Sequence, residues 1–309
     1  MSKAIDTLLE AYKQEKAFTA PPSELHDLAK QSRYVLKTQR GSLDDSTTWN
    51  LVQQHFYLML MTGDDAAAEL ALQELKARFG EDNERIVLCQ TQYIEVTEGL
   101  AKAEEFLKSR DEKEIIPMKR RIALDKFRND YKTFIGNLKV LVGYIPIDAE
   151  MWAELGEAYS TIQEYRKAIF SYQEVLLFAP QAYNIFARIG ELYHAAALQE
   201  AGSLDSVSSL NNGTKENVIN SLKQGLKNFL RSVELCPVYI RGWAGVQVVS
   251  TEALKFIEAG KASSLLTDKE LKYFKQFAEI SERNLLYASS EKGASKTDIE
   301  AAKAILRDY

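Results

Sequence analysis

The sequence has few residues that interrupt helices and no long apolar run. It contains six prolines and fifteen glycines in 309 residues. So few breakers, together with many Ala, Leu, Glu and Lys residues, favour long helices. No stretch of about 18 apolar residues occurs, which predicts that no helix crosses a membrane. Because the first residues carry charges throughout and lack an apolar core, we expect no signal peptide and a chain that stays in the cytosol.

The chain also lacks an excess of basic residues and has only two cysteines. Its net charge is -5 and its pI is about 5.5, so there is no electrostatic reason to expect a nucleic-acid partner. The densest basic spot, at residues 119–121, is typical of a solvated helix face. Cys89 and Cys236 stand far apart and outside any C-x-x-C pair. Buried, reduced thiols in a reducing compartment are the simplest interpretation.

Motifs that carry catalysis or bind metals and cofactors are missing as well. The three histidines, His26, His55 and His194, share no spacing with cysteines or carboxylates that is typical of a metal site. Glycine-rich phosphate loops and the G-x-S-x-G nucleophile motif are absent. We therefore expect no enzyme, no metal and no cofactor. A transferase with appended repeats is the enzymatic alternative, but the repeats described below leave no room for a catalytic domain.

The stretch from 149 to 182 shows a regular packing pattern. Large apolar residues recur at offsets of three, four and seven, which places them on one face of a helix. Small residues stand where two antiparallel helices would approach each other, and a proline ends the second helix. These are the positions that define a tetratricopeptide (TPR) unit, a repeat of about 34 residues. The residues are Trp152, Leu155, Gly156, Tyr159, Ala168, Tyr172 and Pro180.

The same pattern continues on both sides with a constant period. Pro146 precedes Pro180 by 34 residues, and the next first helix carries Phe186, Ile189, Gly190 and Tyr193 at the equivalent positions. The partner helix of this unit begins only after an inserted polar segment at about 198–216, which is rich in Ser, Gly and Asn. We expect this segment to form a loop. Pro237 ends that partner helix, and Trp243 then opens the following unit.

These observations predict an all-α chain, a TPR-type α-solenoid that coils into a right-handed superhelix. We expect N-terminal helices over 1–45, degenerate TPR-like helix pairs over 46–114, TPR repeats over 115–256 and C-terminal capping helices over 257–309.

The candidate binding residues lie on the first helices of the repeats. Glu157 and Glu191 occupy position nine, which faces the concave surface, and with Glu154 they would form an acidic strip for a basic partner segment. Solvated surface charge is the alternative. The polar segment at about 198–216, which is the insert after His194, would either make a specific contact with a partner or be a flexible loop that tolerates changes of sequence. Some TPR proteins hold the terminal carboxylate of a chaperone through Lys and Asn at positions five and nine. Here Ala and Glu occupy those positions, and Glu would repel a carboxylate.

The segments 145–197 and 226–246 resemble subunit 2 of the endoplasmic reticulum (ER) membrane protein complex in its fungal form. The resemblance is best over about 115–250. It implies a non-catalytic scaffold, peripheral on the cytosolic face of the ER membrane. Its implied partners are cytosolic parts of membrane subunits such as subunits 3 and 5, and cytosolic subunit 8 or 9. The complex inserts tail-anchored and multipass membrane proteins without ATP.

Only the packing positions of the family carry over to this sequence. Exposed aromatic residues such as Tyr183, Tyr239 and Trp243 would suit a permanent interface, and core packing is the alternative for each. A freestanding TPR adaptor that reads short peptide segments of chaperones or other partners is the alternative function.

Overall fold

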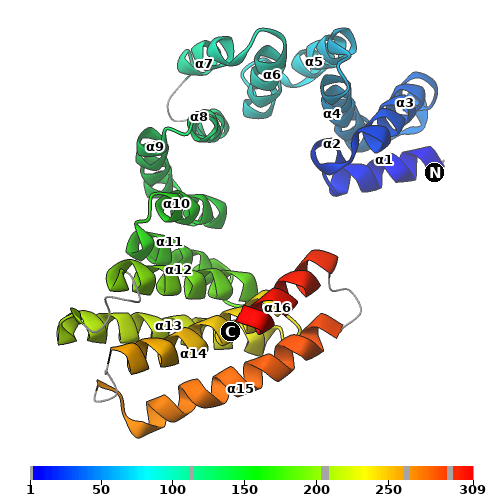
Figure 1. Cartoon of the computed structure of the whole chain (residues 1–309). Helices are drawn as coiled ribbons and strands as arrows, with labels where there is room; N and C mark the ends of the chain where they lie inside the picture. The colour runs from blue at the N-terminus through cyan, green and yellow to red at the C-terminus, as the bar shows by residue number, and fades with distance from the viewer. Residues whose placement is uncertain (1–2, 111–113, 203–208, 261–264, 291–294, 309) are drawn as a thin grey trace. The chain divides into compact units, whose positions relative to one another are not determined.

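The structure is a computed structural model, and it describes residues 3–110, 114–202, 209–260, 265–290 and 295–308. Within these residues it contains sixteen α-helices, one short 3-10 helix (Arg40–Ser42) and no strand (Figure 1). The all-α prediction is therefore confirmed. The chain forms two compact units, Met1–Asn129 and Asp130–Tyr309. The boundary lies inside our expected repeat region of 115–256, so the first helix of that region, Ile115–Phe127, belongs to the first unit and the later ones to the second. The finer division into four segments stays a prediction.

The first unit is built around a helix that is apolar on several faces. Helix α4 buries Leu51, Val52, Phe56, Leu58 and Met59 and contacts α1, α2, α3 and α5. A helix that is apolar all round is stable only when neighbours cover it, so the other helices fold around α4. The helices of this unit are α1 (Lys3–Lys13), α2 (Lys16–Thr19), α3 (Pro22–Thr38), α4 (Asp45–Met61), α5 (Asp65–Phe79), α6 (Glu84–Thr97), α7 (Leu100–Lys108) and α8 (Ile115–Phe127).

The second unit consists of successive helices that pack pairwise along the chain, with α10 against α11, α12 against α13, and α14 against α15 (Figure 1). Each helix also packs on the next pair, as α11 does on α12 and α13 on α14. This nearest-neighbour burial is the defining property of a solenoid. The helices are α9 (Tyr131–Tyr144), α10 (Ala149–Thr161), α11 (Tyr165–Phe178), α12 (Tyr183–Ala201), α13 (Asn212–Leu235), α14 (Ile240–Ala259), α15 (Asp268–Ser290) and α16 (Lys296–Asp308).

The segment for which we expected a loop, about 198–216, differs from that expectation at both ends. Helix α12 continues to Ala201, and α13 begins at Asn212, where the side chain of Asn211 accepts a hydrogen bond from the Thr214 amide (2.8 Å). Residues 203–208 lie outside the described part of the chain. The end of α12 is Leu-Gln-Glu-Ala, residues with high helix propensity, and Ala197 and Ala201 pack in the same buried cluster as residues of α13. At the start of α13, Asn212 and Gly213 are exposed, so the cap by Asn211 is the contact that begins this helix.

Glycines allow the closest helix approaches in the second unit. A Cβ at Gly190 of α12 would lie 2.8 Å from the ring of Phe229 in α13, and a Cβ at Gly245 of α14 would lie 2.1 Å from the same ring. Phe229 is 2% exposed, so its ring is enclosed between the backbones of two helices. One pair earlier, a Cβ at Gly156 would lie 2.8 Å from the ring of Tyr172. A larger residue at any of these glycines would separate helices that must be in contact.

The first unit also contains a half-buried titratable group. His55 of α4 places Nδ1 2.8 Å from Oγ of Ser32 in α3, and the Ser32 hydroxyl also donates to the carbonyl of Ala29 (2.9 Å). Burial, with the nearby positive charge of Arg33, lowers the pKa of His55 from 6.5 to about 4. The ring is therefore neutral in the folded chain at neutral pH.

We predict that Gly245→Ala destabilises the chain by about 1–3 kcal/mol, because the added methyl group must displace the enclosed ring of Phe229. The measurement is the midpoint of urea unfolding followed by circular dichroism. Gly136→Ala in α9 is the matched control, since a Cβ there meets nothing within 4 Å. It should raise stability by about 0.5–1 kcal/mol, because alanine favours a helix. Equal effects of the two substitutions would contradict the packing argument.

We further predict that the stability of the first unit falls as the pH is lowered from about 6.5 to about 4. The unfolded chain protonates His55 below 6.5, whereas the folded chain binds this proton only near 4, so protons favour the unfolded state in this window. The free energy of unfolding of the unsubstituted chain should fall across this window, and that of His55→Gln should fall by about 1–3 kcal/mol less. The control is His26→Gln, at an exposed position of α3. If the free energy of unfolding depends on pH in His55→Gln as it does in the unsubstituted chain, His55 does not cause the loss of stability at low pH.

Candidate functional site

Two tryptophans connect the repeats of the second unit through the same hydrogen bond. The indole Nε1 of Trp152 donates to the carbonyl of Pro146 (2.8 Å), and Nε1 of Trp243 donates to the carbonyl of Pro237 (2.7 Å). Each bond joins the first turn of a helix to the proline that ends the preceding helix. Phe186 holds the equivalent position between them and has no such donor. These bonds fix the direction of the chain where one hairpin passes to the next.

The other predicted packing positions separate into core and surface. Leu155, Gly156, Ala168, Tyr172 and Gly190 are buried, and Trp152, Tyr159, Tyr193 and Trp243 are half-buried. Trp243 packs against the buried cluster of Ala244, Leu285 and Ala302, so it is largely a packing residue. Pro180 and Pro237 are exposed at the helix ends.

The carboxylates that we expected to form an acidic strip take part in an alternating row of charges across three first helices, which we call the ion-pair ladder. Arg188 of α12 donates to Glu157 of α10 (2.9 Å), to Ser160 (3.0 Å) and to Glu191 on its own helix (3.1 Å). Arg241 of α14 donates to both oxygens of Glu191 (2.5 and 2.6 Å). The order of charges is therefore negative, positive, negative, positive.

Further contacts tie the ion-pair ladder into the core. The hydroxyl of Tyr172 donates to Glu157 (3.0 Å), and burial raises the pKa of that hydroxyl to about 12. Hydrogen bonds to Glu191 raise the pKa of the Arg241 guanidinium above its ordinary value. Glu154, the third member of the predicted strip, is half-buried and takes part in an interaction within the chain. Glu157 and Glu191 therefore contact cations of this chain, which sequence reasoning had not paired with them.

His194, which precedes the insert in the sequence, contacts a carboxylate of α14. Its Nε2 is 2.5 Å from a carboxylate oxygen of Glu252 in α14, and the two side chains are 19% and 16% exposed. The pair connects α12 to α14. At the start of the same two helices, the rings of Tyr183 and Tyr239 stack edge to face with centroids 4.8 Å apart. Both contacts join neighbouring first helices in the same way as the ion-pair ladder.

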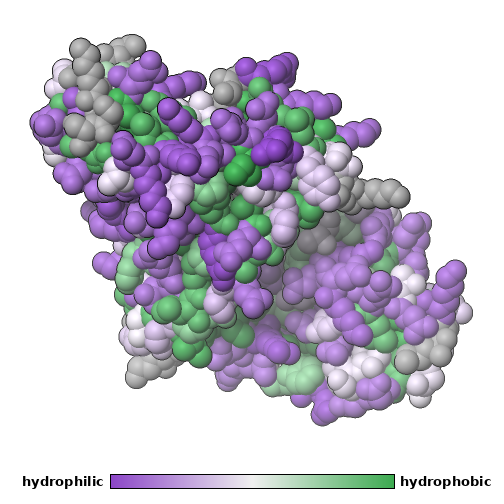
Figure 2. All heavy atoms as spheres, turned by 90° about the horizontal axis from the view of Figure 1, so that it is seen from below, coloured by the Kyte–Doolittle hydropathy of each residue, from purple (hydrophilic) through white to green (hydrophobic). Residues whose placement is uncertain are grey.

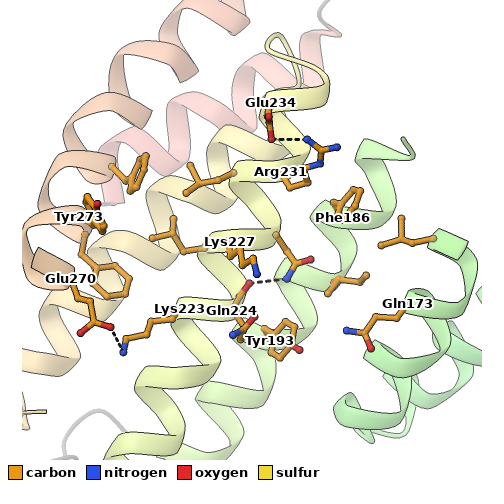
Figure 3. A pocket seen from close by; sticks show the side chains of 17 residues that line it. Gln173, Phe186, Tyr193, Lys223, Gln224, Lys227, Arg231, Glu234, Glu270 and Tyr273 are labelled. Atoms are coloured by element: carbon orange, nitrogen blue, oxygen red, sulfur yellow. Dashed lines mark hydrogen bonds and ion pairs between the residues drawn. The ribbon is translucent and has the colours of Figure 1, made fainter. Parts of the chain in front are cut away.

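A groove of about 1000 Å³ runs along α13, between α11 and α12 on one side and α15 on the other (Figure 3). Phe186, Ile189 and Tyr193 of α12 line one half, and aromatic residues of α15, including Tyr273, line the other. Lys223 pairs with Glu270 (2.7 Å) and Arg231 pairs with Glu234 (2.8 Å) at its edges. The groove is therefore apolar within and charged at the rim, which is typical of a binding site.

In the face shown in Figure 2, hydrophilic and apolar residues are intermixed. No set of three His, Cys, Asp or Glu side chains within the described residues is placed to hold a metal ion. In that same part of the chain, no helix combines the length and the apolar character needed to span a bilayer.

Comparison with known proteins gives a consistent result. Residues 83–202 match the profile of the EMC2 TPR-like repeat domain. The chain is 25% identical over 250 residues to ER membrane protein complex subunit 2 of Saccharomyces cerevisiae, covering 77% of this chain and 81% of that protein. It is 27% identical over 285 residues to the TPR repeat protein oca3 of Schizosaccharomyces pombe, covering 91% and 92%.

Among solved structures, the chain is similar in fold to the C-terminal part of a TPR repeat-containing protein from Cytophaga hutchinsonii. The TM-score is 0.50 and the identity is 12%, with 96% of this chain and 98% of that chain covered. The helix pairs, the packing positions and this likeness define the chain as a TPR-type α-solenoid.

Within that class, the chain is similar to subunit 2 of the ER membrane protein complex, and residues 83–202 match the EMC2 TPR-like repeat domain. The resemblance expected from residues 145–197 and 226–246 is confirmed.

We predict that Arg188→Met destabilises the chain by about 1–3 kcal/mol, because it removes charge-assisted hydrogen bonds to Glu157 and Glu191 but keeps an apolar stem. The free energy of urea unfolding at low and high salt measures the effect. Lys102→Met is the control, since Lys102 and its partner Glu105 are 62% and 76% exposed. It should cost less than about 0.5 kcal/mol. If the two substitutions cost the same, the ion-pair ladder does not join the repeats.

Proposed function

We propose that the chain is a non-catalytic scaffold subunit of the ER membrane protein complex. It lies on the cytosolic face of the ER membrane as a peripheral protein. There it organises the cytosolic side of an ATP-independent insertase for tail-anchored and multipass membrane proteins. Its partners are the cytosolic parts of membrane subunits such as subunits 3 and 5, and cytosolic subunit 8 or 9. The observation that carries the proposal is the family match over residues 83–202 within a TPR-type α-solenoid.

The physical character of the second unit supports a scaffold. Each helix pair buries its apolar face against its neighbours, so the outer faces of many helices remain available for partners. Several of those outer positions are apolar. Tyr144, Ile147 and Leu177 are 68%, 72% and 71% exposed, and Phe170 is 54% exposed. Exposed apolar side chains that gather on one surface are typical of protein interfaces.

A binding role for Glu154, Glu157, Glu191 and His194 stays part of the proposal in a modified form. Since Glu157, Glu191 and His194 have partners within the chain, a basic partner segment would have to compete with Arg188 and Arg241 for the carboxylates. The ion-pair ladder therefore supports a role in holding the first helices in register more directly than a role as an open acidic strip.

The freestanding TPR adaptor is the alternative, and one experiment separates the two. We predict that the tagged chain, extracted from cell membranes in mild detergent, co-purifies with a stoichiometric set of ER membrane protein complex subunits identified by mass spectrometry. Alkaline carbonate should release it from the membrane fraction, because a peripheral protein is held by its partners. Recovery of cytosolic chaperones alone, with the chain absent from membranes, would overturn the scaffold and favour the adaptor.

A further inference from the structure

The second helices of successive hairpins leave a second apolar groove beside the one along α13. This groove, of about 560 Å³, lies between α9 and α11, and we call it the α9–α11 groove. Trp152, Leu155 and Tyr159 of α10 line it. The residues 34 positions later, Phe186, Ile189 and Tyr193, line the α13 groove (Figure 3). The repeat that packs the core therefore also repeats a groove on the side of the second helices.

Helix α11 separates the two grooves and exposes apolar side chains. Phe170 lines the α9–α11 groove and is 54% exposed, and Leu177, two turns further along α11, is 71% exposed. Gln173 and Leu176 of the same helix line the α13 groove. The two grooves and α11 thus form one surface, which we call the second-helix face.

The charges of the second-helix face have a consistent sign in the α9–α11 groove. The charged residues that line this groove, Lys139, Arg166 and Lys167, are all cations. Arg166 pairs with Glu200 (2.7 Å) and Lys167 with Glu164 (3.3 Å), but neither carboxylate lines the groove. Lys139 is exposed and has no ion pair within the residues that the structure describes. The groove therefore combines an apolar interior with a positive rim.

The α13 groove continues this charge pattern more weakly. It is lined by the cations Lys223, Lys227 and Arg231 and by the two carboxylates of Glu234 and Glu270. The carboxylates pair with Arg231 and Lys223, so the cations are in excess by one. By contrast, the ion-pair ladder on the first helices has equal numbers of positive and negative charges. The second-helix face is therefore the surface that attracts an acidic partner.

We propose that the second-helix face binds an acidic amphipathic helix of a partner protein. Its apolar side chains enter the two grooves beside Phe170, and its carboxylates face Lys139, Arg166 and Lys167. This inference rests on the proposed function, since a scaffold binds partner proteins. It adds that the partner segment at this face is acidic and amphipathic. The grooves are concave, which suits the apolar anchors of a helix laid along them.

Fluorescence anisotropy of the purified full chain with two labelled probe peptides tests the proposal. Both peptides have about 18 residues and the same Leu and Phe positions on one helical face, with Glu on the flanks of one and Lys on the flanks of the other. The Glu peptide should bind about tenfold more tightly than the Lys peptide, and added salt should reduce this difference. Equal binding of the two peptides, or no binding of either, would overturn the proposal.

Variants locate the binding surface on the chain. The double substitution Lys139→Glu with Lys167→Glu should weaken the Glu peptide about tenfold, and Phe170→Ala should weaken both peptides about fivefold. Lys303→Glu and Leu286→Ala are matched controls, because they change the same residue classes at exposed positions outside both grooves. Circular dichroism checks that each variant keeps its helix content. If the controls weaken binding as much as the groove variants, the peptide does not bind at this face.

Flotation with phosphatidylserine vesicles examines the competing partner class. Binding of the chain to these vesicles through Lys139 and Lys167, without binding of the Glu peptide, would assign the face to a membrane surface and overturn the proposal. The peptide assay uses the isolated chain, so its failure leaves the membrane pull-down result intact. A failed pull-down with intact peptide binding would overturn the scaffold function alone.

Discussion

The enclosure of the Phe229 ring between the backbones of α12 and α14 is the contact on which the packing of the second unit depends. It requires that Gly190 and Gly245 have no side chain, because a Cβ at either position would overlap the ring. Tyr172 and Gly156 repeat the arrangement one hairpin earlier. Since a solenoid has no single core, each such approach sets the position of every hairpin that follows it.

Polar contacts complete the connection between hairpins in the second unit. The indole bonds from Trp152 and Trp243 fix the chain after Pro146 and Pro237, and the ion-pair ladder joins α10, α12 and α14. Within the ladder, two carboxylates and two guanidinium groups balance one another. The side of the second helices keeps apolar grooves with a positive rim. One repeat therefore produces two surfaces of different chemistry.

A scaffold function agrees with this division. On the side of the first helices, the charges of the ion-pair ladder pair with one another and hold the repeats in register. The second-helix face has the apolar grooves and the excess of cations that the proposed partner would contact. A subunit of a membrane protein complex needs both properties, because it must keep its shape while it holds other chains. The family match over residues 83–202 names the complex in which this is proposed to occur.

The sequence by itself determined the helical hairpins, the TPR class and the close approaches at Gly156 and Gly190, but not the one at Gly245. These depend on local spacing, since residues three, four and seven apart lie on one face of a helix and a proline ends it. Composition did not predict that α12 continues to Ala201 and that α13 begins at Asn212, within the polar segment at 198–216. Only the tertiary structure decided the partners of Glu157, Glu191 and His194 and the existence of the grooves. Arg188 lies 31 residues from Glu157, and Arg241 lies 50 residues from Glu191, so their pairing depends on the rotation between successive hairpins. That rotation is set by the sum of many side-chain contacts, which no local pattern in the sequence records.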